Sequence, residues 1–295
     1  MEQKFSDRDG LIWMNGEVVQ WRDAKIHVLS HGLHYASSVF EGERAYDGNI
    51  FLCEEHSERL LRSANAIDMQ IPFTAEQIST AKREILAANK IADAYIRPVA
   101  WRGSEQMGVS AQKTKVHVAI ACWEWPSYFG GEAREKGIAL QTSKWAAPMP
   151  NTATTSSKAA GLYTTHTMAK HKAEADGFAD ALMLDYRGLV AEATGANIFM
   201  VKDGQIKTPN PDCFLNGLTR QTVIKLAEEQ KIPLEVCQIK PEELLQADEI
   251  FLTGSAAEVT AVGKIDSTLF TVGPVTRNLR EAYESLVRTP KKQAA

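Results

Sequence analysis

Tight turns between short apolar runs recur along this chain and constrain its fold more than any other feature. Asn15-Gly16 separates Leu11–Met14 from Glu17–Trp21, and both turn residues tolerate the positive φ that a two-residue hairpin needs. A second hairpin is expected between Ser38–Tyr46 and Ile50–Cys53. Because such hairpins join antiparallel strands, a doubly wound parallel sheet is disfavoured.

The spacing of apolar residues predicts helices between these hairpins. Thr74 and Gln77 form a capping-box pattern at the start of one helix, and another helix is expected over Ala159–Ala175, ending before a glycine. Ala94–Arg102 alternates like a strand, although Pro98 predicts an edge position, a bulge or an early end. The mixture predicts an α/β (α+β mixed) fold built in layers.

The pattern breaks near the middle of the chain. A proline and the pair Gly130-Gly131 interrupt any regular spacing, and a short charged stretch follows them. We therefore expect a smaller N-terminal domain over residues 1–127, a linker over 128–137 and a larger C-terminal domain over 138–295.

Composition narrows the classes of function. The 295 residues include 33 Lys and Arg against 37 Asp and Glu, a net charge of −4, which disfavours nucleic acid as a partner. The longest apolar run, Val116–Trp123, is far shorter than the ~20 residues of a membrane helix, so no membrane partner is expected. Four scattered cysteines and a polar N-terminus are typical of a cytoplasmic protein with free thiols.

Two glycine-containing segments are candidate anion sites. Leu215–Thr219 places a glycine and a hydroxyl residue directly before a predicted helix, where unpaired N–H groups favour phosphate. Thr253–Ala257 follows a predicted strand with small residues that let a ligand approach the backbone. Each signal is weak alone, because the same residues also serve as ordinary helix caps.

Lys158 is the most unusual cation. It lies among small uncharged residues, where partial desolvation lowers the pKa of a lysine toward that of an amine nucleophile, although a surface-loop lysine is the alternative. Arg59 is either a phosphate ligand or part of a solvated helix face. Tyr95 and Arg97 share one face of a strand and either bind a carboxylate or form a surface pair.

The histidines do not indicate a metal site. His27, His31 and His34 cluster in the sequence, but no carboxylate or cysteine completes a ligand set. We expect them to be packing or surface residues, and no metal is predicted.

Seven sequence blocks follow one another in a characteristic order. They are His34–Arg44, Tyr95–Pro98, Met107–Val109, Ser157–Tyr163, Glu192–Phe199, Leu215–Arg220 and Gly254–Glu258. Together, over about Ile12 to Val262, they resemble the branched-chain amino acid aminotransferases, which are pyridoxal-phosphate enzymes of fold type IV. The resemblance implies two domains with the active site in the cleft between them, and a homodimer at least, with higher homo-oligomers open.

The resemblance also implies a role for individual residues. Lys158 is expected to bind pyridoxal 5′-phosphate as a Schiff base and to move the substrate α-proton, and Glu192 to pair with the pyridinium nitrogen. The implied cofactor contacts are Arg59, Lys158, Tyr163, Glu192, Asn197, Gly217, Leu218, Thr219, Gly254 and Ser255. The implied substrate contacts are Tyr35, Phe40, Gly42, Tyr95, Arg97, Val109, Tyr128, Tyr163, Ser255 and Ala256, of which Tyr35 and Val109 come from the neighbouring subunit.

The implied reaction is transamination between L-leucine, L-isoleucine or L-valine and 2-oxoglutarate, which gives branched-chain 2-oxo acids and L-glutamate. A D-amino acid or (R)-amine transaminase, or aminodeoxychorismate lyase, shares the same fold, and a non-catalytic pyridoxal-phosphate-binding protein is a second alternative. Leu162, Asn216 and Ser255 depart from the usual family residues, as does Glu43, which stands at a position that is usually apolar. On a continuous strand Glu43 points away from the pocket that Gly42 faces.

Overall fold

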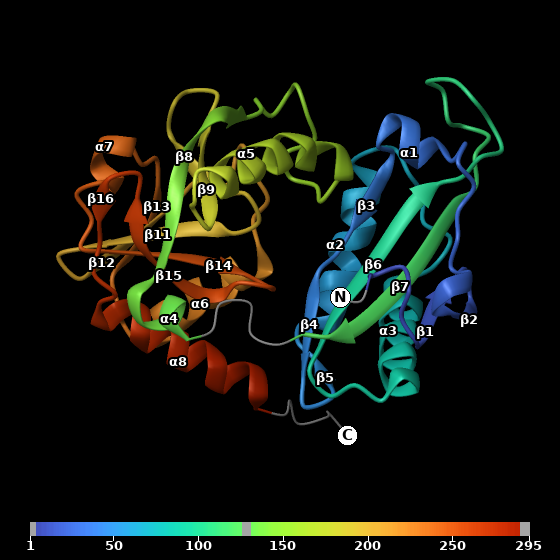
Figure 1. Ribbon diagram of the computed structural model, residues 1–295, viewed down its shortest axis with the longest axis horizontal. Coiled ribbons are helices and arrows are strands. Elements are labelled where there is room, and N and C mark those ends of the chain that lie inside the picture. Colours follow the sequence, from blue (N-terminus) through green and yellow to red (C-terminus); the bar gives the residue numbers. More distant parts are fainter. Residues whose placement is uncertain (1–3, 126–130, 290–295) are drawn as a thin grey trace. The chain divides into compact units, whose positions relative to one another are not determined.

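The computed structural model describes residues 4–125 and 131–289, and the chain divides into two compact units (Figure 1). Unit 1 comprises Met1–Pro126 with Ser157–Gly161, and unit 2 comprises Ser127–Ser156 with Leu162–Ala295. The short segment Ser157–Gly161 therefore packs with unit 1, although it comes from the second half of the chain. The expected boundary over 128–137 stays a prediction; residues 128–130 of it lie outside the described residues, and its last part contains α4 (Glu132–Lys136).

Unit 1 is built on a seven-stranded antiparallel sheet with the order β2-β1-β7-β6-β4-β5, in which β3 also pairs with β6. The strands are β1 (Leu11–Met14), β2 (Glu17–Gln20), β3 (Ser38–Phe40), β4 (Glu43–Tyr46), β5 (Asn49–Ile50), β6 (Ala94–Arg102) and β7 (Val116–Glu124). The helices are α1 (His31–Tyr35), α2 (Cys53–Asn65), α3 (Ala75–Asn89) and the 3-10 turn η1 (Trp21–Asp23). α3 packs against β1 and β7, and α2 packs against α3.

Local sequence signals account for much of unit 1. Asn15 and Gly16 both have positive φ, as the predicted hairpin requires. Thr74 accepts the N–H of Gln77, whose side chain accepts the N–H of Thr74, so the predicted capping box is confirmed. These reciprocal bonds satisfy two backbone donors at the N-terminus of α3 and mark where the helix begins.

One predicted strand is interrupted. The run 38–46 forms β3 and β4 with a break at residues 41 and 42, so the assumption of one continuous strand is wrong. Pro98 lies inside β6, which pairs with β7 on one side and with β3 and β4 on the other and continues in regular register to Arg102, so the expected edge position, bulge or early end is wrong. Its carbonyl accepts the N–H of Glu41. In an antiparallel strand the N and O of one residue face the same neighbour, so the donor that Pro98 lacks would point at the break.

Unit 2 is built on a nine-stranded sheet with the order β10-β9-β8-β15-β14-β11-β12-β13, in which β16 also pairs with β15. The strands are β8 (Ile138–Ala147), β9 (Asp180–Asp185), β10 (Val190–Ala193), β11 (Asn197–Lys202), β12 (Gln205–Pro209), β13 (Leu234–Cys237), β14 (Glu249–Gly254), β15 (Glu258–Ile265) and β16 (Thr268–Leu269). An additional pairing of β10 with β11 closes six of these strands into a ring. The closing pair is Glu192 opposite Asn197, and apolar residues of the ring strands form a buried core.

Helices pack around the sheet of unit 2. They are α4, the 3-10 turn η2 (Ala160–Leu162), α5 (Tyr163–Ala175), α6 (Leu218–Glu229), α7 (Pro241–Leu244) and α8 (Pro274–Arg288). α5 packs on β8 and β9, whereas α6 and α8 pack on β14 and on each other. α8 is absent from the predicted elements, and α5 begins four residues later than expected because η2 precedes it. Among the described residues no helix combines the length and apolar character needed to cross a bilayer.

Candidate active site

Lys158 is anchored to unit 1 by its backbone. Its N–H donates to Ser63 Oγ on α2 at 2.9 Å, and its carbonyl accepts the N–H of Phe40 at 3.2 Å. The next residue, Ala159, forms a β-bridge with Val39. The side chain is half-buried, with Nζ 4.9 Å from the centre of the Phe40 ring. The backbone of this lysine is therefore held by β3 and α2 rather than lying in a free surface loop.

Arg59 is also buried rather than on a solvated helix face. Its Nε and Nη2 donate to the two carboxylate oxygens of Glu41, each at 2.7 Å, and His56 Nδ1 lies 2.8 Å from Glu41 Oε2. Because the Arg59 and His56 side chains face it, the pKa of the Glu41 carboxyl is held well below its usual range, although burial opposes that shift. Sequence reasoning missed Glu41 and His56 as partners of Arg59. The helical i, i+3 spacing of His56 and Arg59 is the signal that places both on one face of α2.

Tyr95 and Arg97 lie together on β6, as predicted from their alternation. Arg97 Nη2 donates to the Tyr95 hydroxyl at 3.1 Å, and the Arg97 guanidinium lies 4.7 Å from the centre of the Phe40 ring. Gly42 lies directly against this pair, because a Cβ there would come within 1.9 Å of the Tyr95 hydroxyl oxygen. Four predicted substrate contacts, namely Phe40, Gly42, Tyr95 and Arg97, are therefore neighbours in unit 1.

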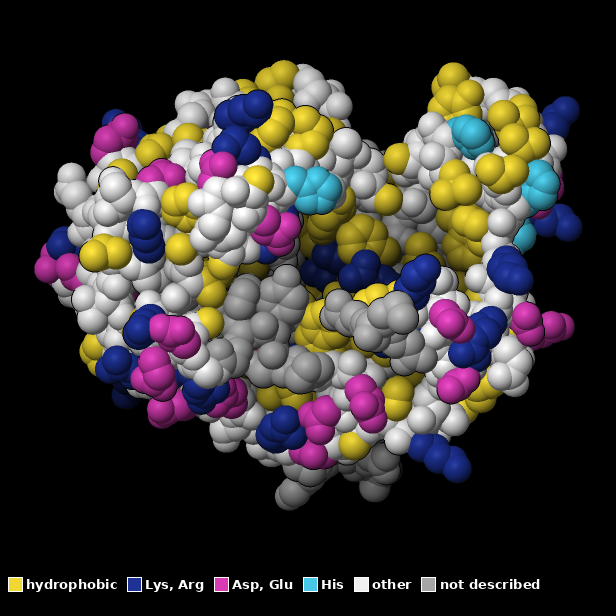
Figure 2. Space-filling model, viewed as in Figure 1, with side chains coloured by type: hydrophobic (Ala, Val, Ile, Leu, Met, Phe, Trp, Pro, Cys, Tyr) yellow, Lys and Arg dark blue, Asp and Glu magenta, His cyan; other side chains and the backbone are white. Residues whose placement is uncertain are grey.

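Other predicted substrate contacts of the N-terminal region lie elsewhere. Tyr35 and Val109 are exposed, with 44% and 83% of their surface accessible. Figure 2 shows hydrophobic side chains gathered over the region where Figure 1 labels α1. Tyr128 lies outside the described residues.

Glu192 and Asn197 meet at the strand pair that closes the ring of unit 2. Asn197 Nδ2 donates to Glu192 Oε2 at 3.2 Å and to the Leu215 carbonyl at 3.0 Å, while its Oδ1 accepts the N–H of Gly217 at 3.1 Å. One amide thus connects the buried Glu192 carboxylate to the residue that caps α6. A Cβ on Gly217 would lie 2.4 Å from Asn197 Oδ1, so glycine is required for this approach.

His166 is a residue of this region that sequence reasoning missed. Its Nε2 lies 3.6 Å from Glu192 Oε1, and its ring is T-shaped against Tyr163, with ring centres 5.3 Å apart. Both residues lie on one face of α5 because they are three positions apart. That spacing from the predicted cofactor contact Tyr163 is the signal that identifies His166.

The residues around the two glycine-containing turns suit an anion. Leu218 and Thr219 form the buried first turn of α6, where backbone N–H groups are unpaired within the helix. Gly254 ends β14, and Ser255 and Ala256 are half-buried in the turn that follows. The adjoining Thr253 hydroxyl is buried without a hydrogen-bond partner among the described residues. Thr253 lies opposite Asn197, which bonds to the N-cap Gly217 of α6, so this buried hydroxyl and the helix N–H groups fit a phosphate group of a bound cofactor.

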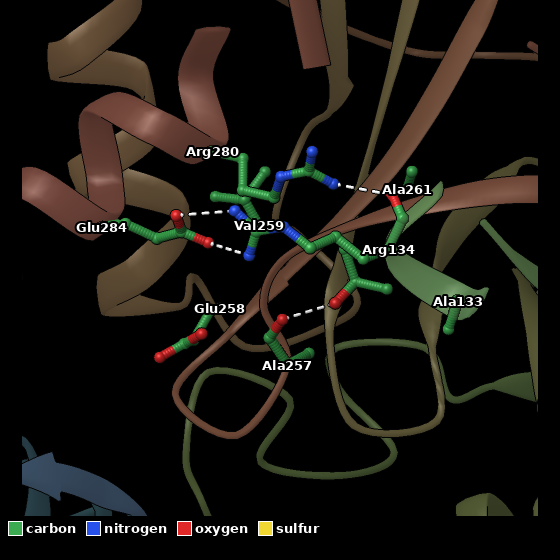
Figure 3. Close-up of a pocket in the computed structure, with 9 residues that line it drawn as sticks. Ala133, Arg134, Ala257, Glu258, Val259, Ala261, Arg280 and Glu284 are labelled. Atoms are coloured by element: carbon green, nitrogen blue, oxygen red, sulfur yellow. Dashed lines mark hydrogen bonds and ion pairs between the residues drawn. The ribbon is translucent and has the colours of Figure 1, made fainter. Parts of the chain in front are cut away.

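A separate cavity of unit 2 does not fit a cofactor. Figure 3 shows it between α4, the start of β15 and α8. Arg134 binds Glu284 through two contacts of 2.6 and 2.9 Å, and Arg280 donates to the Arg134 carbonyl at 2.9 Å. The cavity volume of about 20 Å³ is close to that of a single water molecule.

Comparison with known proteins identifies relatives over almost the whole chain. Residues 38–265 match the model of the family described as amino-transferase class IV. The chain is 45% identical to a branched-chain-amino-acid aminotransferase of Pseudomonas aeruginosa, covering 96% of this chain and 94% of that protein. It is 38% identical to the protein of the same name from Escherichia coli, covering 93% and 92%.

Solved structures give the same result. A T.th. branched-chain amino acid aminotransferase with pyridoxamine 5′-phosphate superposes with a TM-score of 0.93, at 42% identity over 96% of both chains. A branched-chain aminotransferase of Thermoproteus uzoniensis with norvaline gives a TM-score of 0.91, at 37% identity over 95% of both chains. These comparisons confirm the fold class and the resemblance inferred from the seven blocks. At the level of the family they also confirm the predicted enzyme class, an aminotransferase, and the predicted cofactor, pyridoxal phosphate.

Proposed function

Because the chain belongs to the class IV amino-transferase family, we propose that it is a branched-chain amino acid transaminase that uses pyridoxal 5′-phosphate. Its amino donors are L-leucine, L-isoleucine and L-valine, and its acceptor is 2-oxoglutarate. The observation that carries the proposal is the shared name of relatives at 38–45% identity over more than nine-tenths of each chain. Lys158 and Glu192, the amine and the carboxylate that such chemistry needs, are both present.

Lys158 is proposed to bind the cofactor through Nζ and to carry the substrate α-proton. Pyridoxal phosphate, when bound, supplies an electron sink next to the α-carbon of the substrate. Two backbone hydrogen bonds to Ser63 and Phe40 hold the lysine main chain, so the amine moves while its attachment point stays fixed. This arrangement suits a residue that must bind a ligand and then transfer a proton.

Glu192 is proposed to face the ring nitrogen of the cofactor. Its carboxylate is oriented by Asn197 Nδ2, and an ionised carboxylate stabilises a protonated pyridine nitrogen. Tyr163 and Asn197 are further cofactor contacts in this proposal. His166, 3.6 Å from Glu192 Oε1, limits the other side of the carboxylate.

We assign six residues to the phosphate group of the cofactor. They are Arg59, Gly217, Leu218, Thr219, Gly254 and Ser255. Helix N–H groups and a guanidinium together provide donors and positive charge for a dianion.

A separate set of residues is assigned to the substrate. It consists of Phe40, Gly42, Tyr95, Arg97, Tyr128, Tyr163, Ser255 and Ala256 of one subunit, with Tyr35 and Val109 of its neighbour.

The proposed active form is a homodimer. We name as the apolar patch the exposed large hydrophobic residues of segments 28–35 and 107–109, namely Val28, Leu29, Leu33, Tyr35, Met107 and Val109. The two segments are joined through His31, and exposed apolar residues gathered in this way are typical of a protein-binding surface. A cytoplasmic location is proposed as well, since all four cysteines are free thiols.

The first test is amino transfer by the purified protein. With L-leucine and 2-oxoglutarate we expect L-glutamate to form, and we expect Lys158→Ala to reduce the rate by at least about 10²-fold. Lys225→Ala, which removes an exposed lysine of α6, is the matched control and should leave the rate unchanged. Turnover of only D-alanine or (R)-1-phenylethylamine would instead assign a different transaminase of this fold, and cofactor binding without any turnover would assign a carrier.

A further inference from the structure

The apolar patch is made from two segments that are far apart in the sequence. Tyr35 ends α1, whereas Met107 and Val109 lie in the connection between β6 and β7. Neither segment has a long helix or strand to fix its shape. Their side chains are mostly exposed, so packing among them does not fix their relative placement.

His31 connects the two segments. It is buried, with 3% of its surface accessible, and its Nδ1 lies 2.6 Å from Ser37 Oγ. Its Nε2 lies 3.1 Å from the Gly108 carbonyl and 3.3 Å from the Val109 carbonyl. The backbone N–H of His31 also donates to the carbonyl of Gly103 at 2.8 Å.

The chemistry of these partners requires a hydrogen on one ring nitrogen. Carbonyl oxygens only accept hydrogen bonds, so His31 Nε2 donates to the loop carbonyls, and Nδ1 pairs with the Ser37 hydroxyl. The two ring nitrogens therefore bind Ser37 and the 108–109 backbone from opposite edges of one rigid side chain. The ring centre also lies 4.5 Å from that of Tyr35, so the same side chain supports one aromatic residue of the patch.

We propose that His31 is a positioning residue that sets the placement of Tyr35 relative to Val109. This inference rests on the proposed function, in which both side chains cross to the neighbouring subunit and line its substrate site. His31 touches neither substrate nor cofactor. It acts on dimer affinity and on the fit of the branched side chain, and it leaves the chemical step unchanged.

The test uses His31→Phe in the full-length, cofactor-loaded protein. Phenylalanine keeps a ring against Tyr35 but removes the hydrogen bonds of both ring nitrogens, to Ser37 and to the 108–109 carbonyls. We expect KM for L-leucine to rise up to about tenfold, because a partly buried hydrogen bond to a backbone carbonyl contributes about 0.5–1.5 kcal/mol, with kcat within about twofold. The dissociation constant of the dimer, measured by analytical ultracentrifugation, should rise as well.

Two further variants make the test decisive. Ser37→Ala removes only the Nδ1 partner and should shift KM and dimer affinity in the same direction by less, which covers the case that His31→Phe fails to fold. His171→Ala, an exposed histidine on α5, is the control and should match the wild type. A His31→Phe protein with wild-type KM and dimer affinity would overturn the inference. A wild-type protein that does not transaminate L-leucine would overturn the proposed function, and the ultracentrifugation result would still decide the role of His31.

Discussion

Glu41 and Glu43 are two residues apart and fully buried, yet their surroundings shift their pKa values in opposite directions. Glu41 is bound by two nitrogens of the Arg59 guanidinium and by His56, and the pKa of its carboxyl is lowered. Glu43 is bound by Lys82, at 2.8 and 3.0 Å, and burial raises the pKa of its carboxyl. A planar guanidinium with a second donor outweighs desolvation, whereas one ammonium does not.

The break between β3 and β4 separates the two carboxylates. Glu41 lies in the break and faces α2, while Glu43 begins β4 and reaches α3, where Lys82 Nζ also donates to the Cys53 carbonyl at 2.7 Å. One short segment therefore supports two different tasks. The Glu41 cluster orients an arginine that we assign to the cofactor phosphate, and the Glu43 pair joins the sheet to a core helix.

The largest expected effect is on the Glu43 pair. Lys82→Met should reduce the free energy of unfolding by about 3–5 kcal/mol, because it leaves a buried carboxylate without its cation. The double variant Lys82→Met/Glu43→Leu should recover most of that loss, since a well-packed apolar pair replaces both charges. Urea denaturation measures the free energy of unfolding of the single and the double variant. A single variant that loses less than about 1 kcal/mol would show that Glu43 needs no cation to stay buried, because it takes up a proton or is hydrated, and the comparison would fail.

A second variant pair separates function from stability. Glu41→Gln should weaken pyridoxal-phosphate binding about tenfold, because an amide can no longer accept from both nitrogens of Arg59, and hydrogen bonds to charged groups contribute about 1.5–3 kcal/mol. Glu43→Gln is the matched control and should lower stability without changing cofactor affinity. Absorbance titration of the apoprotein measures the affinity. Equal losses of cofactor affinity in both variants would contradict the division of tasks.

The opposite pKa shifts predict opposite pH dependences. The lowered pKa of Glu41 stabilises the fold above its ordinary value of 4.5, and that contribution is lost as the pH falls below it. The raised pKa of Glu43 favours the fold at low pH, and that contribution is lost as the pH rises above 4.5. Each slope is at most about 1.4 kcal/mol per pH unit. Unfolding free energies from pH 3 to pH 8 should therefore fall less steeply toward acid in Glu41→Gln and less steeply toward alkali in Glu43→Gln.

The sequence predicts those features that short-range chemistry decides. The Asn15-Gly16 hairpin and the Thr74 capping box depend on residues within three positions of each other, and both are confirmed. The break at residues 41 and 42 depends instead on a register with β6, which no local pattern encodes. α8 is absent from the predicted elements, although it packs on the sheet of unit 2.

The candidate site shows the same division. Motif resemblance selects Lys158, Glu192 and Arg59, but it does not predict what holds them. Asn197 reaches Glu192 because β10 and β11 close a ring, and Glu41 reaches Arg59 because a strand is interrupted. Both are tertiary contacts, so the positions of the supporting residues follow from the fold and not from the blocks alone.

The smallest expected effect concerns an exposed ion pair, which shows how much of the effect at the Glu43–Lys82 pair depends on burial. Arg62 and Glu58 form an ion pair at 3.5 Å on α2, the helix that carries Arg59, but about 60% of each side chain is accessible to solvent. Arg62→Ala should change the free energy of unfolding by no more than about 0.5 kcal/mol, because water screens an exposed i, i+4 pair. Urea denaturation of Arg62→Ala and Lys82→Met under the same conditions measures both changes in the free energy of unfolding. A loss as large as that of Lys82→Met would mean that the charge pair itself, and not its burial, determines stability in unit 1.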